Sequence, residues 1–462
     1  MRRLSVAAMA LLLGACSSLK PWLNQPIGPA SPLPSAATVH VDSQQAPPSI
    51  VAAITLSGGG ARAAAFGLGV LTELQATRFF WEGRDTSVLD HVGLVSGVSG
   101  GSILATYYAA FGERTFSDFE REFLLADFQA GLLAKAFAPR ALYRMSSPWY
   151  GRTDVLAASL DKLYQSRTFA DLQHRQHGPR LLVTATDLTT GAPFEFTPEQ
   201  FALICSDLNS VPLSYAVAAS SAVPLLLSPV TLRNYAGACP QSAQVVHAMH
   251  EERNLPSRLL NAIVESYLDA EHRPYLHLVD GGLVDNLGVR GLLDRSAAGG
   301  SLDSAFQNLL PGSVHKVILI SVDSERDVAE RIDSSAKVPG TLQVLDALVF
   351  GAGSRATKET LASMQDNARR WTEELAAVRG KAGSPFAADA QVHVISVALR
   401  DVKDRQVRSA LLQVPTALTI LPLQVRQLEA AGRAALRESP EFIQLRSSLG
   451  AHSAPVTHEE VK

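Results

Sequence analysis

The amino-acid sequence predicts an α/β protein whose central sheet is mainly parallel and covered by helices on both faces. Three observations support this fold class. Short apolar runs recur along the chain, helix-length segments rich in Ala and Leu separate them, and glycine-marked turns follow three of the runs. The chain has 462 residues, of which 47% are hydrophobic and 18% charged, so it can bury a large core.

The first expected strand covers residues 50–56, where a continuous apolar run indicates a strand buried on both faces. The helix that follows covers residues 61–74. The same order repeats with a strand over 92–98 and a helix over 102–111. Further strands are expected over residues 180–186, 276–279, 316–322 and, at the sheet edge, 391–397, and a last long helix over 423–449.

Residues 50–330 are expected to form the main domain, which residues 235–275 interrupt with a stretch rich in His and Glu. We interpret this interruption as an insertion near the active face, where it could act as a lid. Residues 331–462 are expected to form a C-terminal extension that packs on the same domain. The formal charge of −3 and the lack of a Lys/Arg-rich stripe argue against a nucleic-acid partner, and the oligomeric state is left open.

The N-terminus has the pattern of a bacterial export signal. Two arginines and a short apolar run lead to Leu13-Gly14-Ala15-Cys16, which resembles a lipobox. We therefore expect residues 1–15 to be a signal peptide and Cys16 to carry lipid, with an ordinary signal peptide as the alternative. The serines after Cys16, by resemblance to Gram-negative lipoproteins, indicate the outer membrane. Residues 16–49 are rich in Pro, Ser and Ala, as in a tether.

Two further cysteines, Cys205 and Cys239, lie in the main domain. In an oxidising periplasm they could form a disulfide. They could equally be two separate buried thiols, because sequence spacing does not show whether their Cα atoms approach closely enough.

The strongest chemical motif is Gly97-Val98-Ser99-Gly100-Gly101, between an expected strand and an expected helix. This is the strand–turn–helix setting of a nucleophile elbow, in which Gly97 and Gly101 allow a sharp turn and leave the serine hydroxyl exposed. The N-terminus of the helix adds positive potential where an oxyanion would develop. Ser99 is therefore the candidate nucleophile, and a serine in an ordinary glycine-rich turn is the alternative.

A second glycine motif, Ser57-Gly58-Gly59-Gly60-Ala61-Arg62, follows the first strand. Consecutive glycines expose backbone N–H groups that can bind a phosphate or the oxyanion of an acyl-transfer intermediate. The same residues match a dinucleotide fingerprint, but no acidic residue ends a clear second strand about 20 residues on. We expect Gly58, Gly59 and Gly60 to form an oxyanion hole and Arg62 to support the loop or meet a phosphate.

The third motif is Asp280-Gly281-Gly282, at the end of another expected strand. A carboxylate there would face the same cleft, although an Asp that merely forms the turn is an equal alternative. Asp285 and Asn286 are expected to shape the loop. No histidine is well placed to complete a Ser-His-Asp triad, since His315 and His393 begin strands at the wrong sheet edge. The candidate base is therefore Asp280 itself.

In this order, the three motifs resemble those of the patatin-like phospholipase family, over roughly residues 50–330. The segment 218–224 and Asp187 also match family positions, whereas Ala63 stands where the family often has Gly. The resemblance implies a three-layer α/β/α fold and a Ser99–Asp280 dyad that hydrolyses acyl esters of lipids. It also implies that no metal or other cofactor takes part.

The sequence therefore supports two main hypotheses for the function. The first is a serine acyl hydrolase of the phospholipase A or lysophospholipase kind, which acts on a lipid or ester through an acyl-enzyme. The second is a non-catalytic outer-membrane lipoprotein that binds lipid or a protein partner. Attachment of a fluorophosphonate to Ser99 distinguishes the two. A dinucleotide enzyme is a third hypothesis, and it predicts a bound coloured or fluorescent cofactor.

Overall fold

The computed structural model describes residues 19–28, 49–173, 178–239, 254–299, 301–306, 308–326, 336–340, 344, 352–450 and 452–453. An eight-stranded sheet forms the centre of this part of the chain, with the path β10-β9-β1-β4-β5-β8-β7 and with β6 beside β5. Its strands are β1 (Ile50–Leu56), β4 (Val92–Val98), β5 (Arg180–Asp187), β6 (Pro193–Glu195), β7 (Val230–Arg233), β8 (Tyr275–Asp280), β9 (Val314–Asp323) and β10 (Phe386–Ala398).

All six expected strands are present, and the strands from β10 to β5 run parallel to their neighbours. The predicted fold class, a mainly parallel sheet flanked by helices, is confirmed. The sheet departs from parallel pairing at its other end, where β8 runs antiparallel to both of its neighbours, β5 and β7. An apolar run reports that a strand is buried, but it carries no information on the direction of the strand.

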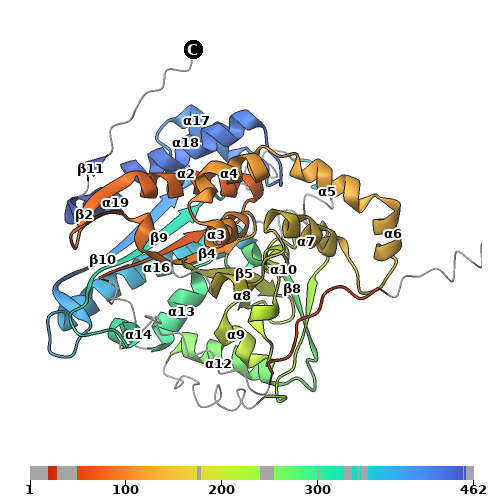
Figure 1. Ribbon diagram of the computed structural model, residues 1–462, viewed down its shortest axis with the longest axis horizontal. Coiled ribbons are helices and arrows are strands. Elements are labelled where there is room, and N and C mark those ends of the chain that lie inside the picture. The colour runs from red at the N-terminus through yellow and green to blue at the C-terminus, as the bar shows by residue number, and fades with distance from the viewer. Residues whose placement is uncertain are drawn as a thin grey trace, which may run out of the picture.

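Helices cover both faces of the sheet, and Figure 1 shows α2 and α18 on one side and α13, α14 and α16 on the other. The helices are α2 (Gly60–Ala76), α3 (Gly100–Phe111), α4 (Arg114–Phe119), α5 (Phe128–Ala136), α6 (Pro139–Met145), α7 (Arg152–Leu163), α8 (Phe169–Gln173), α9 (Pro198–Leu203), α10 (Leu213–Ser220), α12 (Leu255–Leu268), α13 (Arg290–Gly299), α14 (Leu302–Phe306), α16 (Ala352–Val378), α17 (Arg405–Leu412), α18 (Pro422–Glu438) and α19 (Pro440–Leu449). A small antiparallel sheet comprises β2 (Thr77–Trp81), β3 (Arg84–Ser87) and β11 (His452–Ser453).

The side chains of β1 show how the sheet separates two cores. Ile50, Ala52 and Ile54 belong to the core under α2 and α3, whereas Val51 and Ala53 pack against the core that α13, α14 and α16 cover. Successive residues of a strand point to opposite faces, so a strand that is apolar at every position buries both. The continuous apolar pattern of β1 therefore places it at the centre of a three-layer fold.

The C-terminal part of the chain completes this domain. Strand β10 forms the sheet edge beside β9, as expected for residues 391–397. Helix α18 crosses α2 so closely that a Cβ on Gly69 would lie 2.1 Å from the Glu429 carbonyl oxygen. The expected single helix over 423–449 is in fact two, α18 and α19, because Pro440 has no N–H to continue the first helix and Ser439 caps the second.

The expected tether at residues 16–49 is docked on the domain in its described part, residues 19–28. The buried Asn24 side chain donates hydrogen bonds to Ser206 Oγ and the Arg233 carbonyl, both at 2.8 Å. Ile27 N–H donates to the Cys205 carbonyl. A Pro- and Ser-rich composition indicates a segment with little core of its own, but it does not prevent such a segment from binding along an existing surface. Cys16 and residues 29–48 lie outside the described residues.

Cys205 and Cys239 form a disulfide, which decides between the two alternatives that the sequence leaves open. The bond joins Cys239, near the start of the segment that we expected to be a lid, to Cys205, which lies outside that segment. Of that segment, the structure describes residues 235–239 and 254–275. Its helix α12 packs against α9 and α13, and none of the described residues of the segment lines the pocket described below. Among the described helices, none is both long and apolar enough to cross a membrane.

Candidate active site

Ser99 occupies a strained turn between β4 and α3. Its backbone has φ 49° and ψ −121°, a region that residues with a side chain rarely adopt, and it caps the N-terminus of α3. The flanking glycines make the turn sterically possible. A Cβ on Gly97 would lie 2.5 Å from Ser102 Cα, and one on Gly100 would lie 2.1 Å from the Gly60 carbonyl oxygen. The local sequence therefore produces the tight elbow expected for an exposed nucleophile.

A second serine, Ser220, is hydrogen-bonded to the backbone of the elbow. Ser220, at the end of α10, accepts a 2.8 Å hydrogen bond from Ser99 N–H and donates a 2.6 Å bond to the Thr184 carbonyl on β5. All three residues are buried. The strained backbone of Ser99 is thus tied to the neighbouring strand through one hydroxyl. Ser220 lies in the segment 218–224, but no pattern in the sequence predicts this role for it.

Because of the strand register, the three motifs lie at the same height along the strands of the sheet. Leu56 of β1 pairs with Gly97 of β4, so Gly58 and Ser99 are each two residues beyond that pair. A Cβ on Gly58 would lie 3.4 Å from Ser99 Cβ. Val98 pairs with Thr184, and the next residue of β5, Ala185, pairs with Asp280. The antiparallel direction of β8 therefore still delivers Asp280 to the level of Ser99.

Asp280 is buried, with 7% of its surface exposed. Its Oδ1 accepts a 2.8 Å hydrogen bond from Gly282 N–H, and its main-chain N–H donates to the Ala222 carbonyl. Burial raises the pKa of Asp280 to about 6, against the opposing effect of the Gly282 amide and the Ser99 hydroxyl. A carboxylate with this pKa is a better proton acceptor at neutral pH than an exposed aspartate.

The glycine loop separates the three amides that we expected to act together. Gly58 N–H already donates to Asn286, to both the carbonyl oxygen and Oδ1 at 3.1 Å. Gly60 begins α2 against the Ala417 carbonyl and does not line the pocket, whereas Gly59 does. No described residue is found to accept a hydrogen bond from Gly59 N–H. The structure therefore leaves Gly59 as the amide best placed to receive an oxyanion.

Arg62 is buried beneath this loop. Its Nε donates to the Ser324 carbonyl at 2.9 Å, and its Nη1 donates to the Val414 carbonyl at 2.6 Å. Burial, together with the nearby Arg326, lowers the pKa of Arg62 to about 10. These bonds join the loop after β9 and the loop before α18 to the glycine loop, which is the supporting role expected for Arg62.

The turn after Asp280 is fixed by two side chains. Asp285, also buried, accepts hydrogen bonds from Val289 N–H and Arg290 N–H, and burial raises the pKa of Asp285 to about 6. Asn286 bonds Gly58, as described above. Asp187 is not part of this turn: it forms a buried 2.7 Å ion pair with Arg273 and does not line the pocket.

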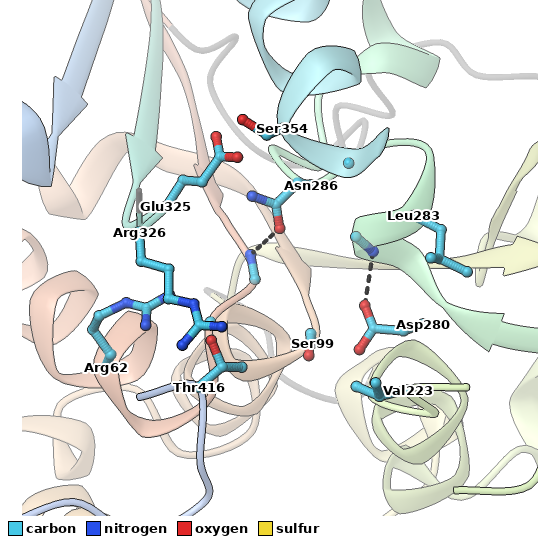
Figure 2. Close-up of a pocket in the computed structure, with 14 residues that line it drawn as sticks. Arg62, Ser99, Val223, Asp280, Leu283, Asn286, Glu325, Arg326, Ser354 and Thr416 are labelled. Carbon is cyan, nitrogen blue, oxygen red and sulfur yellow. Dashed lines mark hydrogen bonds between the residues drawn. The ribbon is translucent and has the colours of Figure 1, made fainter. Parts of the chain in front are cut away.

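A pocket of about 600 Å³, its open mouth included, brings Ser99, Asp280, Gly58, Gly59 and Arg62 together. Figure 2 shows the carboxylate of Asp280 directed toward Ser99. One end holds the guanidinium groups of Arg62 and Arg326, and the other holds the apolar Val223 and Leu283. The remaining lining residues are Gly282, Asn286, Glu325, Gly353, Ser354 and Thr416.

Fold and pocket define a class of protein: a three-layer α/β/α domain in which a serine at a strand–helix elbow faces a buried carboxylate. The family model described as patatin-like phospholipase matches residues 54–293, more than half of the chain. The chain belongs to this family. No curated protein matches it in sequence.

Solved structures with a similar fold include the human GIVD cytosolic phospholipase A2, with a TM-score of 0.45 and 12% identity over 87% of this chain. The match covers 62% of the human chain, so this protein spans less than two thirds of that enzyme's length. VipD from Legionella pneumophila has a TM-score of 0.29 and 12% identity, over 96% of this chain and 73% of VipD.

Proposed function

We propose that this protein hydrolyses acyl esters of lipids through a Ser99–Asp280 dyad. The observation that carries the proposal is the placement of Ser99, in a strained elbow that lines the pocket, opposite a buried carboxylate whose pKa is raised to about 6. Membership of the patatin-like phospholipase family supports the lipid ester as the substrate class. A phospholipase A or lysophospholipase subtype is part of the proposal.

In the first step, Asp280 accepts the proton of the Ser99 hydroxyl while Ser99 Oγ attacks the ester carbonyl carbon. The resulting tetrahedral intermediate collapses, the bond to the leaving alcohol breaks, and the proton on Asp280 passes to that alcohol. The product is an acyl-enzyme on Ser99 with Asp280 again ionised.

In the second step, Asp280 takes a proton from a water molecule, whose oxygen attacks the acyl carbon. Collapse of the second tetrahedral intermediate breaks the bond to Ser99 Oγ, which regains its proton from Asp280. The fatty acid leaves, and the enzyme returns to its starting state. The same carboxylate acts as base and then as acid in both halves, so no histidine is needed.

The negative charge on the carbonyl oxygen requires donors in both steps. We assign this role to Gly59 N–H, helped by the positive potential at the N-terminus of α3. The Gly58 amide can join only if it releases both the carbonyl oxygen and Oδ1 of Asn286, to which it donates in this structure. Removal of one such donor typically costs roughly 10²–10³ in rate.

The two ends of the pocket favour an amphiphilic substrate. The charged side chains of Arg62, Arg326 and Glu325 make one end polar, whereas Val223 and Leu283 form an apolar wall near Asp280 at the other. A lipid bound with its polar head toward the arginines and its acyl chain along the apolar wall would present its ester to Ser99. This polarity supports a lipid ester over a small, fully polar ester.

Assays of Ser99→Ala and Asp280→Asn test the proposal on a soluble short-chain ester and on phospholipid vesicles. We expect Ser99→Ala to lose hydrolysis and fluorophosphonate labelling, and Asp280→Asn to lower kcat/KM by at least about 10³-fold. Ser221→Ala is the matched control, because Ser221 is a buried serine next to Ser220 that does not line the pocket. Full activity in either dyad variant contradicts the assignment, and a folded wild type without labelling favours the non-catalytic lipoprotein.

We also propose that the protein is exported and lipid-anchored through Cys16 in the outer membrane. The lipobox-like sequence motivates this proposal, and the Cys205–Cys239 disulfide supports an oxidising compartment. Labelling of cells with radioactive palmitate checks it. Label should enter the protein and disappear in Cys16→Ser, and equal labelling of both would show that Cys16 is not the attachment site.

A further inference from the structure

Helices α5 and α6 expose large apolar side chains at the surface of the molecule. Neither helix has a single buried residue, although Leu, Ala and Phe make up most of α5 and α6 carries Leu142 and Tyr143. Figure 1 shows them projecting at one edge of the molecule, outside the helix layers. Their large exposed side chains continue onto two neighbouring loops, and we call this surface the apolar rim: Leu133, Phe137, Leu142, Tyr143, Trp149 and Leu226, each between 50% and 71% exposed.

The charge of the apolar rim is one-sided. Between Asp127 and Asp154 the sequence holds four cations and no acidic residue, in a chain whose net charge is −3. The cations are Lys135, Arg140, Arg144 and Arg152. Exposed aromatic and aliphatic side chains interleaved with Lys and Arg are typical of helices that lie in the interface of a bilayer with anionic lipids. An apolar protein partner gives no reason for this positive charge.

Hydrogen bonds tie the apolar rim to both sides of the pocket mouth. At the start of α5, Gln129 N–H donates to Thr419 Oγ1 and its side chain accepts from Leu418 N–H. The loop that holds Leu418 and Thr419 also contributes Thr416 to the pocket lining.

On the other side, Arg152 Nη2 donates to the Leu225 carbonyl at 2.6 Å. That loop begins at Val223, which lines the pocket. Leu225 and Leu226 are 57% and 67% exposed, so exposed apolar side chains follow Val223 along the loop to which Arg152 is bonded.

The start of the described chain lies on the same surface. Ser147 Oγ donates to the Leu19 carbonyl at 2.7 Å, and Lys20 Nζ lies 5.7 Å from the centre of the Trp149 ring. Cys16 is three positions before Leu19, and three residues span at most about 11 Å. A lipid attached at Cys16 would therefore hold the membrane beside the apolar rim.

From these contacts we propose that the apolar rim docks the protein on an anionic lipid bilayer, with Phe137, Leu142 and Trp149 in the interface and the pocket mouth facing the lipids. This inference rests on the proposed lipid hydrolysis for its purpose, but the docking itself is a separate physical event. Docking in this orientation lets a lipid enter the pocket without crossing open water.

The test uses the full chain with Cys16→Ser and Ser99→Ala, so that neither lipid attachment nor vesicle hydrolysis interferes. Sedimentation is measured with vesicles of phosphatidylcholine alone and of phosphatidylcholine with one third phosphatidylglycerol. We expect stronger binding to the anionic vesicles and a loss of binding with added salt. Arg140→Gln with Arg144→Gln should weaken anionic binding by about five-fold for each charge, hence about 25-fold together.

The apolar contribution has a matched control in the chain. Phe137 and Phe80 are both 71% exposed, and Leu142 and Leu259 are both 50% exposed, but Phe80 and Leu259 lie on β2 and α12, outside the apolar rim. The pair Phe137→Ser/Leu142→Ser should lower partitioning by at least about ten-fold, and Phe80→Ser/Leu259→Ser should leave it unchanged. Equal loss in both pairs, or no binding to either vesicle, overturns the proposal.

A local signal identifies the docked face. Brominated lipids should quench the fluorescence of the exposed Trp149, and the quenching should disappear in Trp149→Phe. With Ser99 restored, the apolar-rim variants should hydrolyse the soluble short-chain ester at the wild-type rate. A wild type that binds vesicles but hydrolyses nothing contradicts the proposed function alone, whereas intact hydrolysis with unchanged binding of the rim variants contradicts the docking alone.

Discussion

The floor of the pocket, which comprises the elbow at Ser99, the glycine loop and Asp280, differs from the apolar rim in what determines its geometry. In the floor, main-chain atoms fix the geometry: glycines of the elbow and of the glycine loop touch one another without side chains between them, and Ser99 is held in a strained conformation. In the rim, α5 and α6 have no fully buried residue, and Leu133, Leu142 and Tyr143 on them are at least half exposed. The elbow thus tolerates almost no added atom, whereas the rim has open space.

The difference indicates which property each region serves. Acyl transfer needs the nucleophile, base and oxyanion donor held within a fraction of an ångström, which close-packed backbone provides. Binding to a fluid lipid surface needs apolar area and charge but no fixed partner atom. We therefore expect substitutions in the floor to act on folding and chemistry, and substitutions in the rim to act on lipid binding.

The largest effect is expected for Gly100→Ala in the floor. A Cβ there would lie 2.1 Å from the Gly60 carbonyl oxygen and 2.3 Å from Gly60 N, so α2 and α3 must separate. We expect a loss of about 3 kcal/mol in the free energy of unfolding, together with loss of hydrolysis. Chemical denaturation of the purified variant measures the first, and an ester assay measures the second.

The matched control is Gly131→Ala on α5 in the rim. Gly131 also lies in a helix, but no atom lies within 4 Å of its added Cβ. Replacement of a helical glycine in open space should raise the free energy of unfolding by about 0.5–1 kcal/mol, because alanine favours the helix. Equal effects of the two substitutions would remove the contrast between floor and rim.

The sequence predicted the floor better than the rim, and the reason is physical. Glycine clusters after buried strands leave few alternatives for the backbone, so the elbow at Ser99, the glycine loop and the position of Asp280 in the pocket could all be expected. The limits of β1 and β4 agree with the expected ranges, residues 50–56 and 92–98. The family resemblance then ordered these motifs into one site.

What the sequence did not reveal depends on contacts between distant segments. The bond from Ser99 N–H to Ser220 joins residues 121 positions apart, and Gly58 and Asn286 are 228 positions apart. The direction of β8 depends on its pairing with β7, which no local pattern specifies. Helices α5 and α6 are rich in apolar residues, and sequence alone does not show that Leu133, Leu142 and Tyr143 are exposed while Phe128 and Leu132 pack on the core.

A smaller effect, within the floor itself, concerns the protonation of Asp280. Its pKa of about 6 predicts that kcat/KM is constant above about pH 7 and falls about ten-fold for each pH unit below 6, because the protonated carboxyl cannot accept the Ser99 proton. A pH profile of the wild type on the soluble ester, between pH 5 and 8, measures this. A profile that falls only near pH 4 would mean that burial does not raise this pKa.

Stability should change in the opposite direction. Between pH 3.8 and about 6 the folded protein binds a proton at Asp280 that the unfolded chain does not, so this carboxyl lowers the free energy of unfolding as the pH rises through that window. At 1.4 kcal/mol for each pH unit, the buried charge costs roughly 3 kcal/mol at pH 7.

Asp280→Asn keeps an oxygen for the Gly282 N–H and removes the charge, so it should be more stable than the wild type at pH 7 and similar to it at pH 4. The nearby Asp285 contributes the same pH dependence to both proteins, so the difference between them isolates Asp280. A gain in stability that accompanies the loss of activity would show that the buried catalytic carboxylate destabilises the fold. The charged side chains of the rim are exposed or partly exposed to water, so we expect no such cost there.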